Sequence, residues 1–208
     1  SSPRLPAEIR AELATYYGVI SHLDEQVGRI VAALRETGEL DRTVIIFSSD
    51  HGLALGSHGL TGKQNLYDHT FGVPLLFHGP GIPRGRRLDA ACYLRDLFPT
   101  TCELAGIAIP ETIQGRSLAP VLAGRAQSVH PHVIGYFTNT QRAIREDRWK
   151  LIWYPQAGRQ QLFDLANDTA EARNLAADPR HGARLAELKG KLETWLKANG
   201  DPLFDPKP

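Results

Sequence analysis

The sequence VIIFSSDHGLALGSHGLTGKQNLYDHTFGVPLL, residues 44–76, carries the clearest structural signal in the chain. Its first four residues, 44–47, form an apolar run of β-branched and aromatic side chains without polar alternation. A run of this kind is typical of a strand that is buried on both faces of a parallel sheet. A second apolar run, residues 75–77, closes the segment. We therefore predict an α/β fold in which a polar, glycine-rich loop connects two buried strands.

Asp50 and His51 directly follow the first predicted strand, and Gly52 comes next. Open α/β sheets place their ligand sites at the carboxyl ends of strands. A carboxylate oxygen and an imidazole nitrogen are both metal donors, and a glycine after them lets the chain bend without a Cβ clash. An aspartate at a strand end also caps helices and closes turns, so the dipeptide alone leaves both roles open.

The loop that follows favours the metal hypothesis. Gly56, Gly59 and Gly62 interrupt a polar segment that contains His58 and ends at Lys63. Glycine-rich loops that carry a lysine suit an oxyanion held beside a cation. We therefore predict that this loop holds a divalent metal and an oxyanion-bearing substrate.

Several short segments of this region belong together in order and spacing: SDHG at 49–52, LGSHG at 55–59, GK at 62–63, YD at 67–68, VPL at 73–75 and GPG at 79–81. Together they resemble the sulfatases of the alkaline phosphatase superfamily. In that family an Asp-His pair, Asp-Asn in many members, ligates a calcium ion, and the lysine after the glycine-rich loop contacts the sulfate oxygens. The resemblance implies that Asp50 and His51 are metal ligands, with Ca²⁺ as the expected ion, and that Lys63 is a catalytic, sulfate-binding residue.

The resemblance also implies that the nucleophile lies outside this chain. In sulfatases it is a formylglycine made from a cysteine or serine in the amino-terminal half, within the pattern Cys or Ser, any residue, Pro, any residue, Arg. Residues 1–4 read SSPR, but the register fails because position 5 is leucine. The chain contains no methionine, and its start is not signal-like. We expect a carboxyl-terminal fragment whose partner is the amino-terminal half of the same protein.

Residues 6–37 are predicted to form an amphipathic helix, with Pro6 in its first turn and Gly38 at its end. A short connection then leads to the first strand, so that helix and sheet alternate. Residues 94–105 also have helical spacing, with Pro99 marking either a kink or the start of the helix. The apolar stripe of the long helix consists of Ile9, Leu13, Tyr16, Ile20, Leu23, Val27, Ile30 and Leu34.

The pattern changes after residue 127. Short strand-like runs separated by turn residues predict an antiparallel meander, and residues 184–196 predict a final amphipathic helix. The resemblance implies the same architecture: part of a mixed sheet flanked by helices, followed by a small antiparallel sheet with one packed helix. We expect residues 1–127 to form the carboxyl-terminal portion of the catalytic α/β domain, and residues 128–208 to form a small antiparallel α+β subdomain.

Composition narrows the function classes. The chain of 208 residues has 24 Lys and Arg and 23 Asp and Glu, a formal net charge of +1. This balance gives no case for a nucleic-acid partner, and no apolar run approaches the roughly 20 residues of a membrane span. Cys92 and Cys102 are too few for a disulfide scaffold. The compartment stays open.

Three hypotheses remain. The first is the carboxyl-terminal part of a sulfatase that acts on a small-molecule or carbohydrate sulfate ester. The second is a phosphonate monoester or phosphodiester hydrolase of the same superfamily, and the third is a non-catalytic module that kept the fold. The complete set of Asp50, His51 and Lys63 argues against the third. Since two ligands fall short of the six to eight oxygens that calcium prefers, we expect the isolated chain to bind calcium weakly and to hydrolyse nothing.

Overall fold

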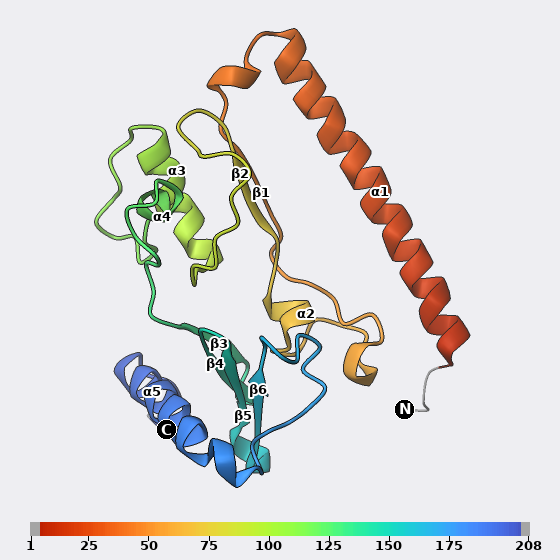
Figure 1. The fold of residues 1–208 in the computed structure, drawn as a ribbon, viewed down its shortest axis with the longest axis vertical. Coiled ribbons are helices and arrows are strands. Elements are labelled where there is room, and N and C mark those ends of the chain that lie inside the picture. Colours follow the sequence, from red (N-terminus) through yellow and green to blue (C-terminus); the bar gives the residue numbers. More distant parts are fainter. Residues whose placement is uncertain (1–4, 205–208) are drawn as a thin grey trace. The chain divides into compact units, whose positions relative to one another are not determined.

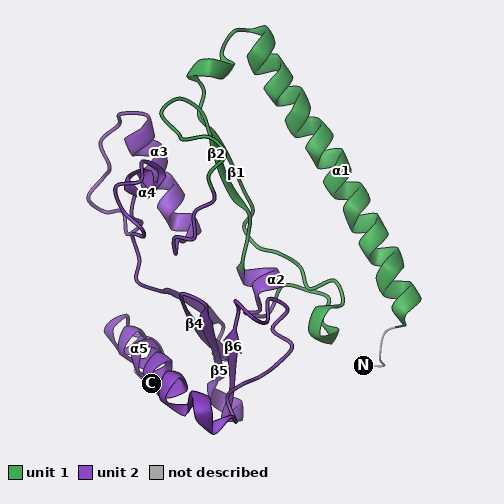
Figure 2. Ribbon diagram, viewed as in Figure 1, with its two compact units in different colours: residues 1–63, 72–86 green, residues 64–71, 87–208 purple. Residues whose placement is uncertain are grey.

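The computed structural model describes residues 5–204, so the SSPR segment lies outside the described part of the chain. The described residues form two compact units (Figure 2). The first unit contains the described residues up to Lys63 and then residues 72–86. The second contains residues 64–71 and the described residues from Arg87 onward. The two units therefore interleave along the chain.

In the first unit, helix α1, Pro6–Glu36, is the long helix that the apolar spacing predicts. Pro6 occupies its first turn, and Gly38, with φ +71°, follows its end in the left-handed conformation. None of the residues of α1 is buried. Leu23 and Ile30 of the apolar stripe are 51% and 63% exposed. The helix prediction is confirmed, and part of its apolar stripe is exposed.

Strands β1, Ile45–Ser48, and β2, Leu75–His78, pair antiparallel, with the last residue of β1 opposite the first residue of β2. The 3₁₀ turn η1, Leu40–Arg42, leads into β1. The prediction of parallel strands buried on both faces is therefore wrong for this pair, and Phe47 and Leu76 are 37% and 58% exposed. A four-residue apolar run specifies neither strand direction nor burial on both faces. Here the connecting loop returns the chain to the neighbouring position in the sheet.

The second unit is built on a four-stranded antiparallel sheet whose strands follow one another in chain order (Figure 1). This confirms the predicted meander. The strands are β3 (Val133–Phe137), β4 (Gln141–Glu146), β5 (Trp149–Tyr154) and β6 (Arg159–Asp164).

Helix α5, Gly182–Ala198, packs against this sheet. Its inward residues Leu188, Leu192 and Leu196 are 0% exposed and form one cluster with Ile144 and other strand residues. Burying a leucine side chain stabilises a fold by about 1.5–3 kcal/mol. The prediction of a small antiparallel sheet with one packed helix is confirmed.

The other helical elements are short. Helix α3, Leu97–Leu104, begins two residues before Pro99, which therefore lies in the first turn and neither starts nor kinks the helix. The remaining elements are η2 (Ser57–Gly59), α2 (Asp68–Phe71), η3 (Leu94–Asp96), α4 (Ala119–Leu122), η4 (Pro155–Ala157) and η5 (Pro179–His181).

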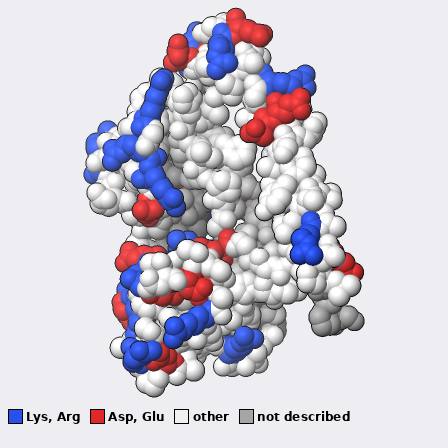
Figure 3. Space-filling model, turned by 45° about the vertical axis from the view of Figure 1, so that its right-hand side comes forward, with Lys and Arg blue, Asp and Glu red and all other residues white. Residues whose placement is uncertain are grey.

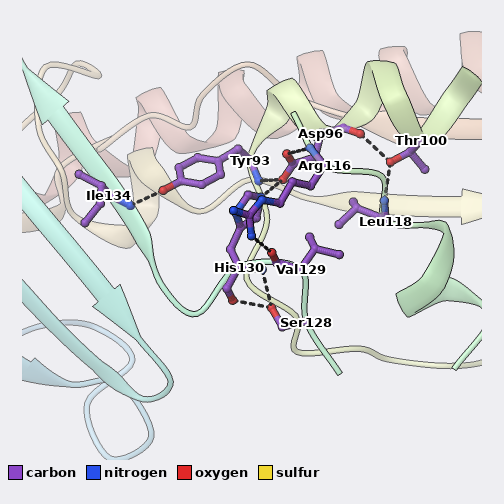
Figure 4. Close-up of polar contacts among 9 residues, drawn as sticks. All are labelled: Tyr93, Asp96, Thr100, Arg116, Leu118, Ser128, Val129, His130 and Ile134. Carbon is purple, nitrogen blue, oxygen red and sulfur yellow. Dashed lines mark hydrogen bonds and ion pairs between the residues drawn. The ribbon is translucent and has the colours of Figure 1, made fainter. Parts of the chain in front are cut away.

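A buried carboxylate organises the segment between these helices and the sheet (Figure 4). Asp96 is 0% exposed. Its Oδ2 accepts hydrogen bonds from the N–H of Tyr93 (2.7 Å) and from Nε2 of His130 (2.8 Å), and its Oδ1 accepts one from the N–H of Arg116 (2.9 Å). One carboxylate thus joins three separate stretches of chain.

The backbone around Asp96 is linked in the same way. Thr100, also 0% exposed, donates its hydroxyl to the Asp96 carbonyl (2.5 Å) and accepts the N–H of Leu118 (2.8 Å). The Tyr93 hydroxyl accepts the N–H of Ile134, the second residue of β3 (2.7 Å). These bonds attach the helical segment to the start of the sheet.

Within residues 5–204, no helix combines the length and the apolar character that crossing a bilayer requires. The face drawn in Figure 3 carries basic and acidic side chains near one another, in keeping with the net charge of +1. Cys92 and Cys102 are free thiols, and Cys102 is buried.

Candidate functional site

Asp50 and His51 lie in a tight turn immediately after β1. The N–H of His51 donates to Asp50 Oδ1 (3.0 Å), and the Ser49 hydroxyl donates to the His51 carbonyl (2.9 Å). The Asp50 side chain is 80% exposed and that of His51 is 30% exposed. The turn therefore fixes the backbone while both side chains remain open to a ligand.

The hydrogen bonds of His51 define which ring nitrogen is available. Its Nδ1 lies 3.0 Å from the Gly52 carbonyl oxygen. Because a carbonyl oxygen only accepts, Nδ1 carries the proton and Nε2 keeps a lone pair. This Nε2 lies 3.3 Å from Asp50 Oδ2 and 2.5 Å from Lys63 Nζ. His51 Nε2 thus accepts from the Lys63 ammonium group and lies next to the Asp50 carboxylate.

The loop between His51 and Lys63 is closed by its own backbone. The N–H of Ala54 donates to the Gly62 carbonyl (3.2 Å), and the N–H of Gly56 donates to that of Leu60 (2.7 Å). These bonds run across the loop, so its end at Lys63 lies close to its beginning at His51. Lys63 is twelve positions after His51 in the sequence. The closure of the loop brings it to Asp50 and His51.

Gly56 is required where it stands. Its φ of +101° is a conformation that side-chain-bearing residues rarely adopt, and a Cβ there would lie 2.9 Å from Ile9 Cγ2 of α1. Leu55 and His58 also have positive φ, 47° and 55°. The glycine spacing in the sequence is therefore explained by loop geometry, and His58 lies in the 3₁₀ turn η2 of this loop.

The donor set suits a divalent metal in part. A carboxylate oxygen and an imidazole nitrogen lie 3.3 Å apart, and both are atom types that bind divalent metals. Within the described range 5–204, no group of three or more His, Cys, Asp and Glu side chains forms a fuller set. Asp50 and His51 therefore fit as two ligands of a site that needs further donors.

Sequence reasoning missed the residues that hold the segment after Lys63. Asp68, the acid of the YD segment, forms an ion pair with Lys150 of β5, whose side chain is 0% exposed. A single lysine within a strand reads as an outward-facing residue, so the sequence gives no signal of its burial.

The chain matches known family models over most of its length. Residues 1–107 match the model described as Sulfatase, and residues 56–198 match the model described as N-sulphoglucosamine sulphohydrolase, C-terminal. The chain is 33% identical over 203 residues to an arylsulfatase of Clostridium perfringens, covering 89% of this chain and 42% of that protein. It is 39% identical over 179 residues to a choline-sulfatase of Rhizobium meliloti, covering 83% of this chain and 34% of that protein.

Solved structures show the same likeness. The fold is similar to that of a 2-O GAG sulfatase, with a TM-score of 0.82 and 30% identity over 96% of this chain and 46% of that one. It is also similar to a phosphonate monoester hydrolase from Silicibacter pomeroyi, with a TM-score of 0.81 and 30% identity over 92% of this chain and 42% of that one.

The fold is thus that of the alkaline phosphatase superfamily, with helices flanking antiparallel strand pairs. Within it, the chain belongs to the sulfatase family. It spans 42% and 34% of the length of the two relatives above.

Proposed function

We propose that this chain is the carboxyl-terminal part of a sulfatase that hydrolyses a sulfate ester with the help of a divalent metal, with Ca²⁺ as the expected ion. The proposal is supported chiefly by one observation. His51 Nε2 lies 3.3 Å from the Asp50 carboxylate and 2.5 Å from the Lys63 ammonium group, so all three predicted residues meet at one place. The substrate class we propose is a small-molecule or carbohydrate sulfate ester.

Each of the three residues has a distinct part in this chemistry. Asp50 and His51 would hold the metal, which when bound lowers the energy of negative charge on the sulfuryl oxygens. Lys63 would contact those oxygens directly and stabilise the charge that they carry in the transition state. The gem-diol nucleophile and the remaining metal donors would come from the amino-terminal half of the parent protein.

Exposed apolar surface on the first unit supports that missing partner. The stripe of α1 includes Leu23 and Ile30, and the strand pair exposes Leu76, each more than half accessible. Large exposed apolar surfaces mark sites of association. We propose that the amino-terminal half covers this surface, and that residues 128–208, which contain the four-stranded sheet and α5, form the small subdomain.

A phosphonate monoester hydrolase is the second candidate. The similarity to the solved structure of such an enzyme, with a TM-score of 0.81, favours it. A metal and a lysine that neutralise oxyanion charge serve phosphoryl and sulfuryl groups alike. Relative rates on the two ester classes distinguish the candidates.

The test compares the 208-residue chain alone with the same chain co-expressed with the amino-terminal part of its parent protein. Activity is measured on aryl sulfates, carbohydrate sulfates and phosphonate monoesters, with and without added Ca²⁺. We expect turnover only when both parts are present, here called the joined protein. The rate should be higher with sulfate esters than with phosphonates, and chelation of the metal should abolish it. Robust turnover by the 208-residue chain alone would contradict the proposal.

Single variants test the three residues in the joined protein. Lys63→Ala removes a charge-stabilising group and is expected to lower kcat by about 100-fold or more. Lys189→Ala, a matched control on α5, is expected to leave kcat unchanged.

A binding measurement tests the metal ligands. By calorimetry, the isolated chain should bind Ca²⁺ only weakly, with a Kd of about 1 mM or above, and Asp50→Ala should abolish that binding.

A further inference from the structure

The segment that follows Lys63 is folded into the second unit. Residues 64–71 belong to that unit, although residues of the first unit precede and follow them in sequence (Figure 2). Lys63 is therefore the last residue of the first unit before the chain crosses over. What holds residues 64–71 also fixes one side of Lys63.

The main attachment is a group of four charged side chains, of which Lys150 and Glu171 are buried and Asp68 and Arg145 are partly exposed. Lys150 Nζ lies 2.8 Å from Asp68 Oδ1 and 2.8 Å from Glu171 Oε1. The Lys150 side chain is 0% exposed and that of Glu171 is 2% exposed. Arg145 Nη1 lies 3.1 Å from Asp68 Oδ2, so the two cations and two carboxylates balance. The N–H of Asp68 donates to Glu171 Oε2 (2.6 Å), which attaches the backbone as well.

Uncharged contacts hold the rest of the segment. Gln141 Nε2 donates to the Gln64 carbonyl (3.2 Å), and the Tyr67 hydroxyl donates to Gln161 Oε1 (3.0 Å).

At the end of this segment, the Phe71 ring packs against Gly135 of β3. A Cβ at position 135 would lie only 2.5 Å from Phe71 Cε2. Only glycine at position 135 allows this approach. The segment is therefore held by the sheet from its first residue to its last.

We propose that Lys150 is a positioning residue for Lys63. The hydrogen bond between Ala54 and Gly62 fixes the chain just before Lys63 (3.2 Å), and the bond from Gln141 to Gln64 fixes it just after (3.2 Å). Neighbouring Cα atoms are only about 3.8 Å apart, so each anchor restrains the chain one residue away from Lys63. The proposal rests on the function proposed for Lys63, since a charge must be placed within about 0.5 Å to act on a reacting group.

Lys150 is the centre of the second anchor. Removing its ammonium group takes away the cation that Asp68 and Glu171 share. Asp68 keeps Arg145, whereas Glu171, 2% exposed, loses the cation beside its Oε1. Truncating one member of a buried ion pair is strongly destabilising because the remaining charge is uncompensated. The expected response is release of residues 64–71 from the sheet, and with it greater freedom of the loop that ends at Lys63.

The experiment compares Lys150→Met with Lys191→Met in the full 208-residue chain. Lys191, on α5, also donates to two carboxylates, Glu146 (2.8 Å) and Glu187 (2.7 Å), and both of these lie outside residues 64–71. Amide hydrogen exchange is measured by NMR at Ala54 and Gly56, whose N–H groups close the loop, and along α5. We expect at least tenfold faster exchange at both loop amides in Lys150→Met and unchanged exchange there in Lys191→Met.

A merely structural role for Lys150 would speed exchange in residues 64–71 but leave Ala54 and Gly56 unchanged, and that result overturns the proposal. If Lys150→Met does not fold, Gln141→Leu decides. This variant keeps the side-chain volume and removes only the bond to Gln64, so about threefold faster exchange at Ala54 supports the proposal, and unchanged exchange overturns it. No catalytic assay is involved, so these outcomes are independent of whether Lys63→Ala loses activity.

Discussion

The Asp50–His51 pair and the Asp96–His130 pair differ in almost every physical respect. Asp50 and His51 are neighbours in sequence, and their side chains are 80% and 30% exposed. Asp96 and His130 are 34 residues apart in sequence, and their side chains are 0% and 8% exposed. The first pair lies in the candidate site and the second lies between helices and sheet.

The difference lies in how far each carboxylate is satisfied. Asp96 receives hydrogen bonds from three nitrogen donors, so it has little capacity left for a ligand. Asp50 receives the N–H of its neighbour His51, and its side chain is 80% exposed to solvent. A buried, saturated acid and base stabilise the fold, whereas an exposed pair with free lone pairs can take a metal. Burial of an Asp-His pair is therefore not by itself evidence of an active site.

The largest expected effect separates these two aspartates by stability. Asp96→Ala removes the acceptor of the buried His130 ring and of two part-buried backbone N–H groups, and we expect it to lower the free energy of unfolding by about 3–5 kcal/mol. Asp50→Ala, at a surface position, should change it by no more than about 0.5 kcal/mol. Urea denaturation measures both. Equal losses of unfolding free energy in the two variants would contradict the difference in stabilising role between the two pairs.

A smaller effect tests the conformation of the loop that holds the exposed pair of Asp50 and His51 beside Lys63. Gly56→Ala forces a side chain into a left-handed conformation and against Ile9, so we expect a loss of about 1–3 kcal/mol in unfolding free energy.

The matched control is Gly190→Ala in α5, where nothing lies within 4 Å of the added Cβ. Helix propensity predicts a gain there of about 0.5–1 kcal/mol. The sign of the change in unfolding free energy should thus differ between the two variants, and a gain in Gly56→Ala would contradict the described loop geometry.

The smallest effect concerns an acid that is satisfied near the surface. Hydrogen bonds from the Arg148 guanidinium hold the pKa of the Asp164 carboxyl below its usual value. A depressed pKa in the folded state adds stability that is present above the unfolded pKa, about 4, and is lost as the pH falls through the folded pKa.

Arg148→Gln should therefore be less stable than the wild type at pH 7 and should lose less stability between about pH 4 and pH 2. Denaturation curves across this range measure the slope, with the exposed Arg173→Gln as the control. Parallel pH profiles for the wild type and Arg148→Gln would show that the pair contributes nothing through ionisation.

Local sequence signals predicted much of the structure. The ends of α1, the strand meander and α5 follow from apolar spacing and from proline and glycine positions, which act over a few residues. The resemblance to sulfatases implied one site for Asp50, His51 and Lys63, and in the structure His51 Nε2 lies 3.3 Å from Asp50 Oδ2 and 2.5 Å from Lys63 Nζ. The roles of these residues in binding metal and sulfate stay predictions.

Features set by distant contacts could not be predicted. The antiparallel direction of β1 and β2 depends on the return path of a loop, and the apolar run gave no information about it. The burial of Lys150 depends on Asp68, 82 residues earlier. The pairing of Asp96 with His130 likewise joins stretches with no shared pattern. Each of these is a property of two segments together, and neither segment alone encodes it.

The interleaving of the two units also implies a delay during synthesis on the ribosome, because residues that contact each other are made at different times. The bond between Asp68 and Glu171 spans 103 residues. At about 5–20 residues per second, the ribosome needs on the order of 5–20 s to produce the second partner after the first. During that interval the segment beside Lys63 waits without its anchor, so the proposed sulfate-binding lysine is among the last parts of the chain to reach its final place.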